Sequence, residues 1–217
     1  MTVDGATIAR LRTSGSSALV SDCLDRIGLR DRTLAPGIVP LAGTGVLVGR
    51  ARTARSVPVT TIPDRPYTEE IALVDSLVAD DVVIGTVGAP VAFWGELFST
   101  AARARGAARL VLDGVVRDRS RIVEMGWPVF ARGTHPTDCN GRISVVERDA
   151  PITILGVRVA PGDLVVADMD GVVIAPAEVA AEVAAAALAK AETEDGARAY
   201  LESGALLREA WDRFRVL

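Results

Sequence analysis

The chain has 217 residues, of which 49% are hydrophobic and 24% charged, as expected of one well-buried core and not of a disordered or fibrous protein. Its formal net charge of −4, with arginines scattered among acids, argues against a nucleic-acid partner. No run approaches the ~20 apolar residues of a membrane span, and the start of the sequence lacks a basic stretch followed by an apolar segment. We therefore expect a single cytoplasmic domain over residues 1–217 that binds neither nucleic acid nor membrane.

Histidine, cysteine and lysine are scarce in this sequence, and their scarcity excludes several classes of catalytic mechanism. His135 is the only histidine, which excludes multi-histidine metal sites and leaves a Ser/His/Asp triad dependent on one loop residue. Cys23 and Cys139 have no CxxC spacing, so neither a zinc knuckle nor a dithiol redox motif is expected. Lys190 is the only lysine and falls in an Ala-rich stretch typical of an amphipathic surface helix, which argues against a Schiff-base lysine.

The first half of the chain alternates between helical and strand patterns. Apolar residues at helical spacing predict helices over residues 5–13 and 17–28, with Ser16 and Ser17 as candidate caps of the second. β-branched residues alternating with arginines predict a strand pair or a long edge strand over residues 45–59. The order of the next elements is typical of βαβ units with a parallel core. These are helices over residues 66–78, 95–106 and 119–125, and strands over residues 81–85, 108–112 and 127–131.

The second half changes to short strands after Gly141. Pro-Gly-Asp and Asp-Met-Asp-Gly turns join them, which predicts an antiparallel or mixed β layer that closes the fold. The predicted strands cover residues 142–147, 152–159, 164–167 and 172–175. Residues 178–202 predict a helix with a break near Gly196, whose Ala-rich face would pack on the body or on a neighbouring subunit.

Two segments gather polar residues where a parallel-sheet protein binds ligands, at the carboxyl ends of strands. In residues 93–98, Gly95 stands at a helix start, where backbone N–H groups and the helix dipole favour a carboxylate. In residues 112–118, an apolar strand ends at Asp113 and Gly114 and is followed by Arg117 and Asp118. A planar bidentate cation suits an anionic oxygen, and the hard carboxylate beside it suits Mg²⁺. Together the segments predict an oxo-acid site.

The same residues also fit a purely structural interpretation. Adjacent Arg and Asp residues are common, and Glu96 fits an ordinary acid in the first turn of a helix. Asp113 and Gly114 would then simply turn the chain.

Residues 94–118, WGELFSTAARARGAARLVLDGVVRD, resemble the signature of the RraA-like family, which contains 4-hydroxy-4-methyl-2-oxoglutarate aldolases and the regulator of ribonuclease activity A. The likeness extends from VSDCLDRIGL through MGWPVFARG to PGDLVVADMDGVVIAP. It implies an α/β fold of the layered α/β/β swivelling kind, with a parallel βαβ core and a C-terminal mixed β layer plus helix. It also implies assembly as homotrimers or hexamers, with sites at subunit boundaries.

The resemblance further implies roles for the residues of this motif. The backbone amides that would hold the substrate carboxylate are those of Gly95, Glu96, Leu97 and Phe98. Arg117 would contact the keto or enolate oxygen, and Asp118 would ligate Mg²⁺ or Mn²⁺, with Glu96 reaching the metal through water. Arg121 stands where family aldolases usually carry an acid, and this departure argues against the classical aldolase substrate. Candidates for an acid lent to a neighbouring subunit are Glu192, Glu194 and Glu202.

Without a lysine to form an imine, cleavage must leave an enolate that a metal and an arginine stabilise. We therefore expect a divalent-metal-dependent lyase acting on a small 2-oxo acid. The reaction would be retro-aldol cleavage of a 4-hydroxy-2-oxo acid, oxaloacetate decarboxylation, or both, giving pyruvate. Two other functions fit: a non-catalytic binding module that regulates a ribonuclease or other protein partner, and a hydratase or dehydratase acting on a sugar-acid derivative.

Several further polar residues have two interpretations each. His135 would be an acid/base or specificity residue at the pocket edge, or else a solvated or capping side chain. Asp168 and Asp170 resemble a metal pair, but the surrounding sequence is typical of a hairpin turn. Asp22 and Asp25 lie three apart on a predicted helix, where a solvated face or interface contacts are expected.

Overall fold

The computed structural model describes residues 3–107 and 109–216, so Ala108, the expected start of one strand, lies outside the described residues. The helices are α1 Gly5–Ser14, α2 Ser17–Arg26, α3 Thr68–Asp75, α4 Glu96–Ala104, α5 Arg119–Glu124, α6 Ala180–Glu202 and α7 Leu207–Phe214. The strands are β1 Val39–Ala42, β2 Leu47–Pro58, β3 Asp81–Thr86, β4 Ala92–Trp94, β5 Arg109–Val116, β6 Val129–Thr134, β7 Ile143–Arg148, β8 Ile152–Ile154, β9 Val157–Val159, β10 Leu164–Ala167 and β11 Val172–Ala175.

A nine-stranded sheet in the described part of the chain has the order β1-β6-β5-β3-β2-β10-β11, with β4 paired to β5 and β7 paired to β2. The pairs β2–β3, β3–β5, β4–β5 and β5–β6 are parallel, which confirms the predicted parallel core. The strands β1, β7, β10 and β11 join this sheet as antiparallel partners. The hairpin of β8 and β9 forms a separate sheet.

The prediction of an edge strand or strand pair over residues 45–59 is wrong. Strand β2 is a single strand of 12 residues in the middle of the sheet. Its first half pairs with β10 and its second half with β7, while β3 lies along its other side. Carboxylates from neighbouring strands and loops pair with the arginines of this strand: Arg55 lies 2.7 Å from Glu147 on β7, and Arg50 lies 3.9 Å from Asp80.

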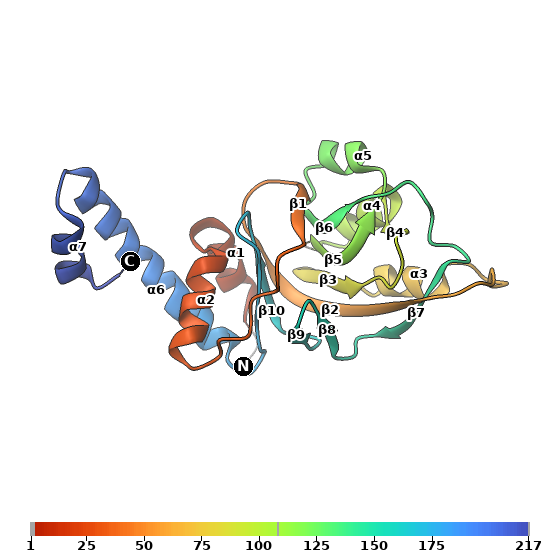
Figure 1. Cartoon of the computed structure of the whole chain (residues 1–217), viewed down its shortest axis with the longest axis horizontal. Coiled ribbons are helices and arrows are strands. Elements are labelled where there is room, and N and C mark those ends of the chain that lie inside the picture. The colour runs from red at the N-terminus through yellow and green to blue at the C-terminus, as the bar shows by residue number, and fades with distance from the viewer. Residues whose placement is uncertain (1–2, 108, 217) are drawn as a thin grey trace.

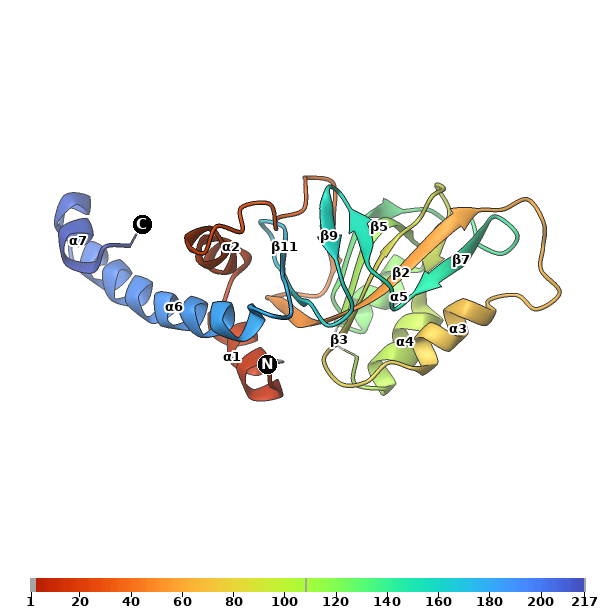
Figure 2. The same cartoon turned by 90° about the horizontal axis from the view of Figure 1, so that it is seen from below.

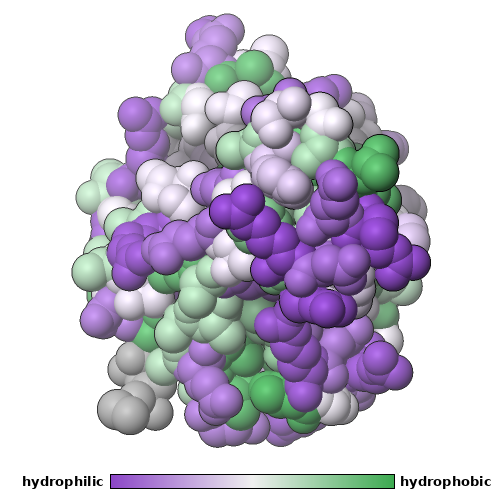
Figure 3. All heavy atoms as spheres, turned by 90° about the vertical axis from the view of Figure 1, so that its left-hand side faces the viewer, coloured by the Kyte–Doolittle hydropathy of each residue, from purple (hydrophilic) through white to green (hydrophobic). Residues whose placement is uncertain are grey.

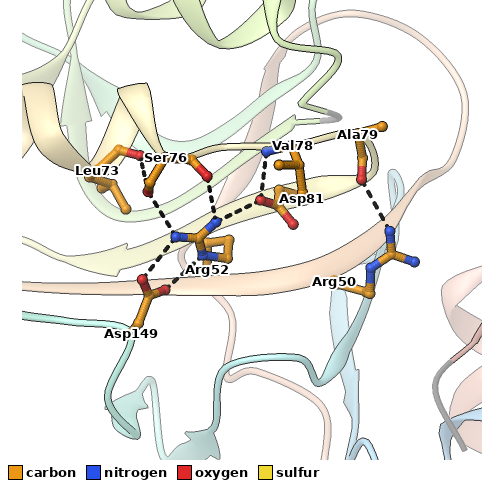
Figure 4. Close-up of polar contacts among 8 residues, drawn as sticks. All are labelled: Arg50, Arg52, Leu73, Ser76, Val78, Ala79, Asp81 and Asp149. Atoms are coloured by element: carbon orange, nitrogen blue, oxygen red, sulfur yellow. Dashed lines mark hydrogen bonds and ion pairs between the residues drawn. The ribbon is translucent and has the colours of Figure 1, made fainter.

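Arg52 shows how such an arginine is satisfied inside the fold (Figure 4). Its Nε and Nη2 atoms donate to the two carboxylate oxygens of Asp149 at 2.7 and 2.8 Å, and Nη1 donates to Asp81 Oδ2 at 2.8 Å. The same guanidinium donates to the carbonyl oxygen and hydroxyl of Ser76 at 3.1 and 2.8 Å. These bonds tie β2 to β3, to the end of α3 and to the loop between β7 and β8.

The layers follow from the alternation of side chains along the central strands. In β3, Val83 packs with the core under α3 and α4, whereas Val82 and Ile84 face the opposite core under β8 and β9. In β5, Leu110 and Leu112 belong to the first core and Val111 to the second. Figures 1 and 2 show α3 and α4 on one face of the sheet and the β8–β9 hairpin on the other. The expected layered α/β/β fold is confirmed.

Helix α6 is continuous over its 23 residues, so the predicted break near Gly196 is wrong. A Cβ atom at Gly196 would lie 3.2 Å from Cε1 of Phe214, which indicates that the glycine serves the close approach of α7 and not a bend. The first half of α6 packs on α1 and α2 through alanines, as expected of docking on the body. The second half projects away from the sheet with α7 (Figures 1 and 2). The face at this end is mostly hydrophilic, with smaller hydrophobic areas (Figure 3).

The prediction that Lys190 lies on a surface helix face is also wrong, because its side chain is only 5% exposed. Its Nζ atom pairs with Asp22 on α2 and lies 2.9 Å from Oε1 of Glu194. Burial acts to lower the pKa of Lys190, but the hydrogen bonds with these carboxylates keep it above its ordinary value. Asp22 therefore contacts α6 within the same chain, whereas Asp25 is exposed.

The structural interpretation of Asp168 is confirmed. Its carboxylate accepts hydrogen bonds from the backbone N and the hydroxyl of Ser17 at 2.6 Å each, at the start of α2. It also accepts from the backbone N of Asp170 at 3.0 Å, which is turn geometry. The expected candidate cap Ser16 is the N-cap of α2, with its side chain accepting from the N of Leu19.

Candidate functional site

The two motif segments meet at the carboxyl ends of β4 and β5, which are parallel neighbours. Trp94 ends β4 and leads through Gly95 into α4, while Val116 ends β5 and leads through Arg117 and Asp118 into α5. The backbone N of Arg117 donates to the carbonyl oxygen of Trp94 at 2.9 Å, which fixes the two turns together. The sequence-based expectation that these segments converge is correct.

The expectation that β5 ends at Asp113 and Gly114 is wrong, since the strand continues to Val116. A Cβ atom at Gly114 would lie 2.6 Å from Cγ2 of Val87, so this glycine lets a neighbouring loop approach the strand. The Asp113 carboxylate pairs with Arg132 on β6 and does not line the cavity described below. Both residues therefore support the sheet.

Gly95 is required by the close approach of the second turn. A Cβ atom there would lie 2.7 Å from Oδ2 of Asp118 and 3.2 Å from Cγ of Arg117. The buried hydroxyl of Ser99 donates to the carbonyl oxygen of Gly95 at 3.0 Å and accepts from Nε1 of Trp94 at 2.9 Å. The first turn of α4 is thus held rigidly against the Arg117–Asp118 turn.

Asp118 has an unusual backbone for a residue at a helix start. Its φ of 59° is left-handed, and its side chain makes no capping bond to α5. Instead, Oδ2 accepts a hydrogen bond of 3.3 Å from the backbone N of Glu96 and lies 3.7 Å from Nε of Arg117. The carboxylate is therefore directed across to α4. Since the first amides of a helix have no intrahelical acceptor, those of Leu97 and Phe98 are left for a ligand once Asp118 has taken that of Glu96.

Two residues of the site were missed by sequence reasoning, namely Asp138 and Tyr67. Asp138, in the loop after β6, places Oδ1 3.1 Å from Nη1 of Arg117. The hydroxyl of Tyr67, which precedes α3, donates to the other oxygen of Asp138. Asp138 follows a parallel strand, so the rule that ligands bind at the carboxyl ends of such strands could have identified it. No sequence signal places Tyr67 beside a residue 71 positions away.

The electrostatics of this pair follow from its contacts. Burial acts to raise the pKa of Asp138, but the Tyr67 hydroxyl, the backbone amide of Asn140 and the charge of Arg117 bring it below its ordinary value. The hydrogen bond to Asp138, with burial, raises the pKa of Tyr67 to about 12. At neutral pH the pair is an ionised carboxylate and a protonated phenol.

These groups form the polar wall of a cavity of about 240 Å³. Its lining consists of Tyr67, Ile71, Ala92, Phe93, Trp94, Gly95, Leu97, Phe98, Arg117, Asp118, Asp138 and Cys139. Apolar side chains make up most of the remaining wall, as in small-molecule sites with a few orienting polar groups. Burial raises the pKa of Cys139 to about 12, so this residue is a protonated thiol, as expected of an unreactive cysteine.

His135 lies beside Arg117 and Asp118 in a neighbouring, more open depression. Its Nδ1 atom accepts a hydrogen bond of 3.2 Å from the backbone N of Thr137, which supports the capping interpretation. With Nδ1 as acceptor, the neutral ring carries its proton on Nε2. Arg121 pairs with Glu124 at 3.1 Å, is largely exposed and does not line the cavity.

The fit of a divalent cation depends on the oxygen donors near α4. The Asp118 side chain is 46% exposed at the cavity, whereas the Glu96 carboxylate accepts a hydrogen bond from the Thr100 hydroxyl at 2.8 Å. Within residues 3–107 and 109–216, no group of three or more His, Cys, Asp or Glu side chains is arranged to hold a metal. A hard cation such as Mg²⁺, which keeps several waters and takes only one or two carboxylates, would be held here by the partly exposed carboxylate of Asp118.

The three candidate acids of the C-terminal region lie far from the cavity of their own chain, because α6 projects from the opposite end of the sheet (Figures 1 and 2). Glu194 is paired with Lys190, and Glu192 lies 3.6 Å from Nη2 of Arg10. Glu202 is exposed in the last turn of α6.

The fold and this cavity define an α/β/β protein in which the guanidinium of Arg117 and the first turn of α4 lie next to the carboxylate of Asp118. Residues 17–174 match the RraA-like family, described as Aldolase/RraA, and the chain belongs to this family.

Three similar proteins have been described. Protein DlpA of Legionella pneumophila is 28% identical over 199 residues, which cover 90% of this chain but only 32% of DlpA, so the chain spans about a third of that relative. A Burkholderia multivorans protein, provisionally named 4-hydroxy-4-methyl-2-oxoglutarate aldolase, is 33% identical over 66% of this chain and 84% of its own length.

The third is a crystal structure, that of Streptomyces coelicolor RraAS2, an unusual member of the RNase ES inhibitor RraA protein family. It is 29% identical and superposes with a TM-score of 0.78 over 91% of this chain and 98% of RraAS2. Of these three proteins, the Burkholderia relative carries an aldolase name and RraAS2 that of a family of ribonuclease inhibitors. Within the described residues, no helix is both long and apolar enough to cross a membrane.

Proposed function

We propose that the protein is a divalent-metal-dependent lyase that cleaves or decarboxylates a small 2-oxo acid and releases pyruvate. The supporting observation is the convergence of Arg117, Asp118 and the first turn of α4 on one wall of a mostly apolar cavity. The provisional aldolase name of the Burkholderia relative agrees with this chemistry.

Each residue of that wall has a distinct task. The first-turn amides of α4 bind the carboxylate of the substrate, chiefly through Leu97 and Phe98. The guanidinium of Arg117 faces the keto oxygen, on which negative charge develops. Asp118 would hold Mg²⁺ or Mn²⁺, with Glu96 reaching the ion through water, and the bound ion would supply Lewis-acid polarisation. Lys190 is not available for an imine in this cavity, because it is buried on α6, where it pairs with Asp22 of α2.

The two reactions share one bond-breaking pattern. The bond between C3 and C4 breaks, its electron pair forms the C2–C3 double bond, and the enolate oxygen on C2 faces Arg117. In decarboxylation C4 leaves as CO₂, whereas in aldol cleavage the 4-hydroxyl group loses its proton as C4 becomes a carbonyl. Protonation of C3 then gives pyruvate in both cases. Loss of one oxyanion contact in such a step costs about 10²–10³ in rate.

We further propose that the active assembly is a homotrimer or hexamer with this cavity at a subunit boundary. The apolar rim supports this, because Leu97 is 77% exposed and Ile71 is 48% exposed in the single chain. A neighbouring copy would cover these side chains and bring its C-terminal acids within reach of the cavity.

The test is pyruvate release from oxaloacetate and from a panel of 4-hydroxy-2-oxo acids, with and without Mg²⁺. Wild type is compared with Asp118→Ala at equal free Mg²⁺, after subtraction of the metal-only background. Asp170→Ala removes an exposed turn carboxylate and serves as the matched control. We expect Asp118→Ala alone to lose the protein-dependent rate. Equal rates for wild type and Asp118→Ala would contradict the proposal.

A second candidate function is a non-catalytic module that inhibits a ribonuclease, and the likeness to RraAS2 favours it. Its measurement is cleavage of an RNA substrate by purified RNase ES, with increasing amounts of this protein. Inhibition that is unchanged in Asp118→Ala, together with no lyase activity, would support this function over the first.

A further inference from the structure

Arg117 is held from two sides by carboxylates. Its Nη1 atom lies 3.1 Å from Oδ1 of Asp138, and its Nε atom lies 3.7 Å from Oδ2 of Asp118. The side chain is 40% exposed, so without these contacts it would sample many rotamers. Bidentate recognition of an oxo acid needs a fixed planar fork. Asp138 therefore restricts the arginine to one orientation along the cavity wall.

Asp138 is itself fixed by other donors. The hydroxyl of Tyr67 and the backbone N of Asn140, at 3.3 Å, both donate to its Oδ2, while Oδ1 faces Arg117. A general base needs an available oxygen and a pKa close to the working pH. Asp138 has neither, since both oxygens are engaged and its pKa is lowered. Its contacts are those of an anchor and not of a proton acceptor.

Tyr67 reaches Asp138 from an unfavourable backbone conformation. Its φ is 60°, in the left-handed region, where a bulky residue is strained and persists only when the surrounding structure imposes the conformation. It makes no side-chain cap to α3, although it occupies the N-cap position. Its ring lines the cavity and packs against the core under α3 and α4. The strained position therefore delivers a hydroxyl to Asp138.

We propose that Tyr67 and Asp138 are positioning residues, which hold the Arg117 guanidinium in the orientation that binds the C2 oxygen of the substrate. The role deepens the proposed function and rests on it. Neither residue touches the reacting atoms: Asp138 acts on the substrate through Arg117, and Tyr67 acts through Asp138.

The test uses oxalate, a planar dianion that resembles the enolate of pyruvate, as a ligand that requires no turnover. Its affinity for the full-length protein in the presence of Mg²⁺ is measured by calorimetry for wild type, Asp138→Asn and Tyr67→Phe. We expect about tenfold weaker binding in both variants, as is typical when a residue that orients a binding group is removed. Tyr200→Phe removes the other tyrosine hydroxyl of the chain, on α6, and should bind as wild type does.

A double-mutant cycle separates positioning from a general effect on the fold. In an Arg117→Ala background, Asp138→Asn should weaken oxalate binding no further, because its effect passes through the arginine. An additive loss in the double variant, or wild-type affinity in Asp138→Asn, would overturn the positioning role while leaving the lyase intact. A wild-type protein that does not bind oxalate would overturn the proposed function and the positioning role with it.

Discussion

Substituting Gly95 by alanine should damage the site without harming the fold around it. The φ and ψ angles of Gly95, −149° and −168°, are extended and open to any residue, so the added methyl group introduces no backbone strain. Its Cβ atom would, however, lie 2.7 Å from Oδ2 of Asp118, closer than carbon and oxygen tolerate. Because Asp118 sits on a turn bonded to Trp94, its carboxylate must swing away from α4.

The magnitude of this effect follows from the direction of that movement. Overpacking costs roughly 1–3 kcal/mol of folding free energy, and the partly exposed Asp118 side chain can relieve much of it by rotating outward. The same rotation misplaces the proposed metal ligand and breaks its bond with the Glu96 amide. Changes of this kind cost about 10–100-fold in metal affinity or activity.

The assay for Gly95→Ala pairs urea denaturation with Mn²⁺ affinity measured by paramagnetic resonance. Gly5→Ala is the matched control, since a Cβ atom there would make only an ordinary contact of 3.5 Å with Asp80. We expect Gly5→Ala to match wild type in Mn²⁺ affinity and to be at least as stable in urea, because alanine favours the helical conformation of α1. Wild-type Mn²⁺ affinity and turnover in Gly95→Ala would refute the claim that this glycine shapes the site.

Three further predictions concern chemistry and stability. Arg117→Lys should lower turnover in steady-state kinetics nearly as much as Arg117→Ala does, because a point charge cannot reproduce a planar fork. Near wild-type turnover in Arg117→Lys would mean that the residue contributes only its positive charge. Borohydride treatment with pyruvate should trap no covalent adduct by mass spectrometry, and exhaustive chelation should abolish turnover; an adduct at Lys190 would contradict enolate chemistry without an imine. Asp149→Asn should destabilise the fold by about 1–3 kcal/mol at pH 7, because Arg52 loses a charged partner. Since the pKa of Asp149 is lowered in the fold, chiefly by its hydrogen bonds with Arg52, this difference should begin to shrink as the pH falls below about 4, the ordinary value of the carboxyl group, and be lost only below the lowered pKa of the folded state, as denaturation over a series of pH values would show.

Local sequence patterns predicted the parallel core because its strands alternate with helices and are apolar on both faces. They misjudged β2, whose arginines resemble a solvated edge until their partners are known. Those partners, Asp81 and Asp149, come from a strand start and a loop distant in sequence, so no local pattern contains them. Lys190 was misjudged for the same reason, since its burial depends on Asp22 in another helix.

The same distinction between local and distant partners separates the site residues that the sequence predicted from those that it missed. Gly95, Arg117 and Asp118 are contiguous with strand ends, and a general rule about parallel sheets brings them together. Asp138 and Tyr67 reach the cavity by tertiary packing of a loop and of the residue before α3. Their roles depend on distances to Arg117 that only the folded chain defines.

Backbone strain bears on whether the Arg117–Asp118 turn is merely structural. An aspartate serving as an ordinary N-cap adopts an extended conformation and bonds the amides of its own helix, as Asp4 does for Thr7 at α1. Asp118 does neither: it is left-handed and turns its carboxylate toward α4. Tyr67, across the cavity, is the second left-handed residue of the wall and also lacks a cap bond. Neither strained conformation makes a capping bond for its own helix. Asp118 directs its carboxylate to the Glu96 amide, and Tyr67 directs its hydroxyl to Asp138, the partner of Arg117. The strain is therefore better explained by the proposed site than by the stability of the helices that these residues precede.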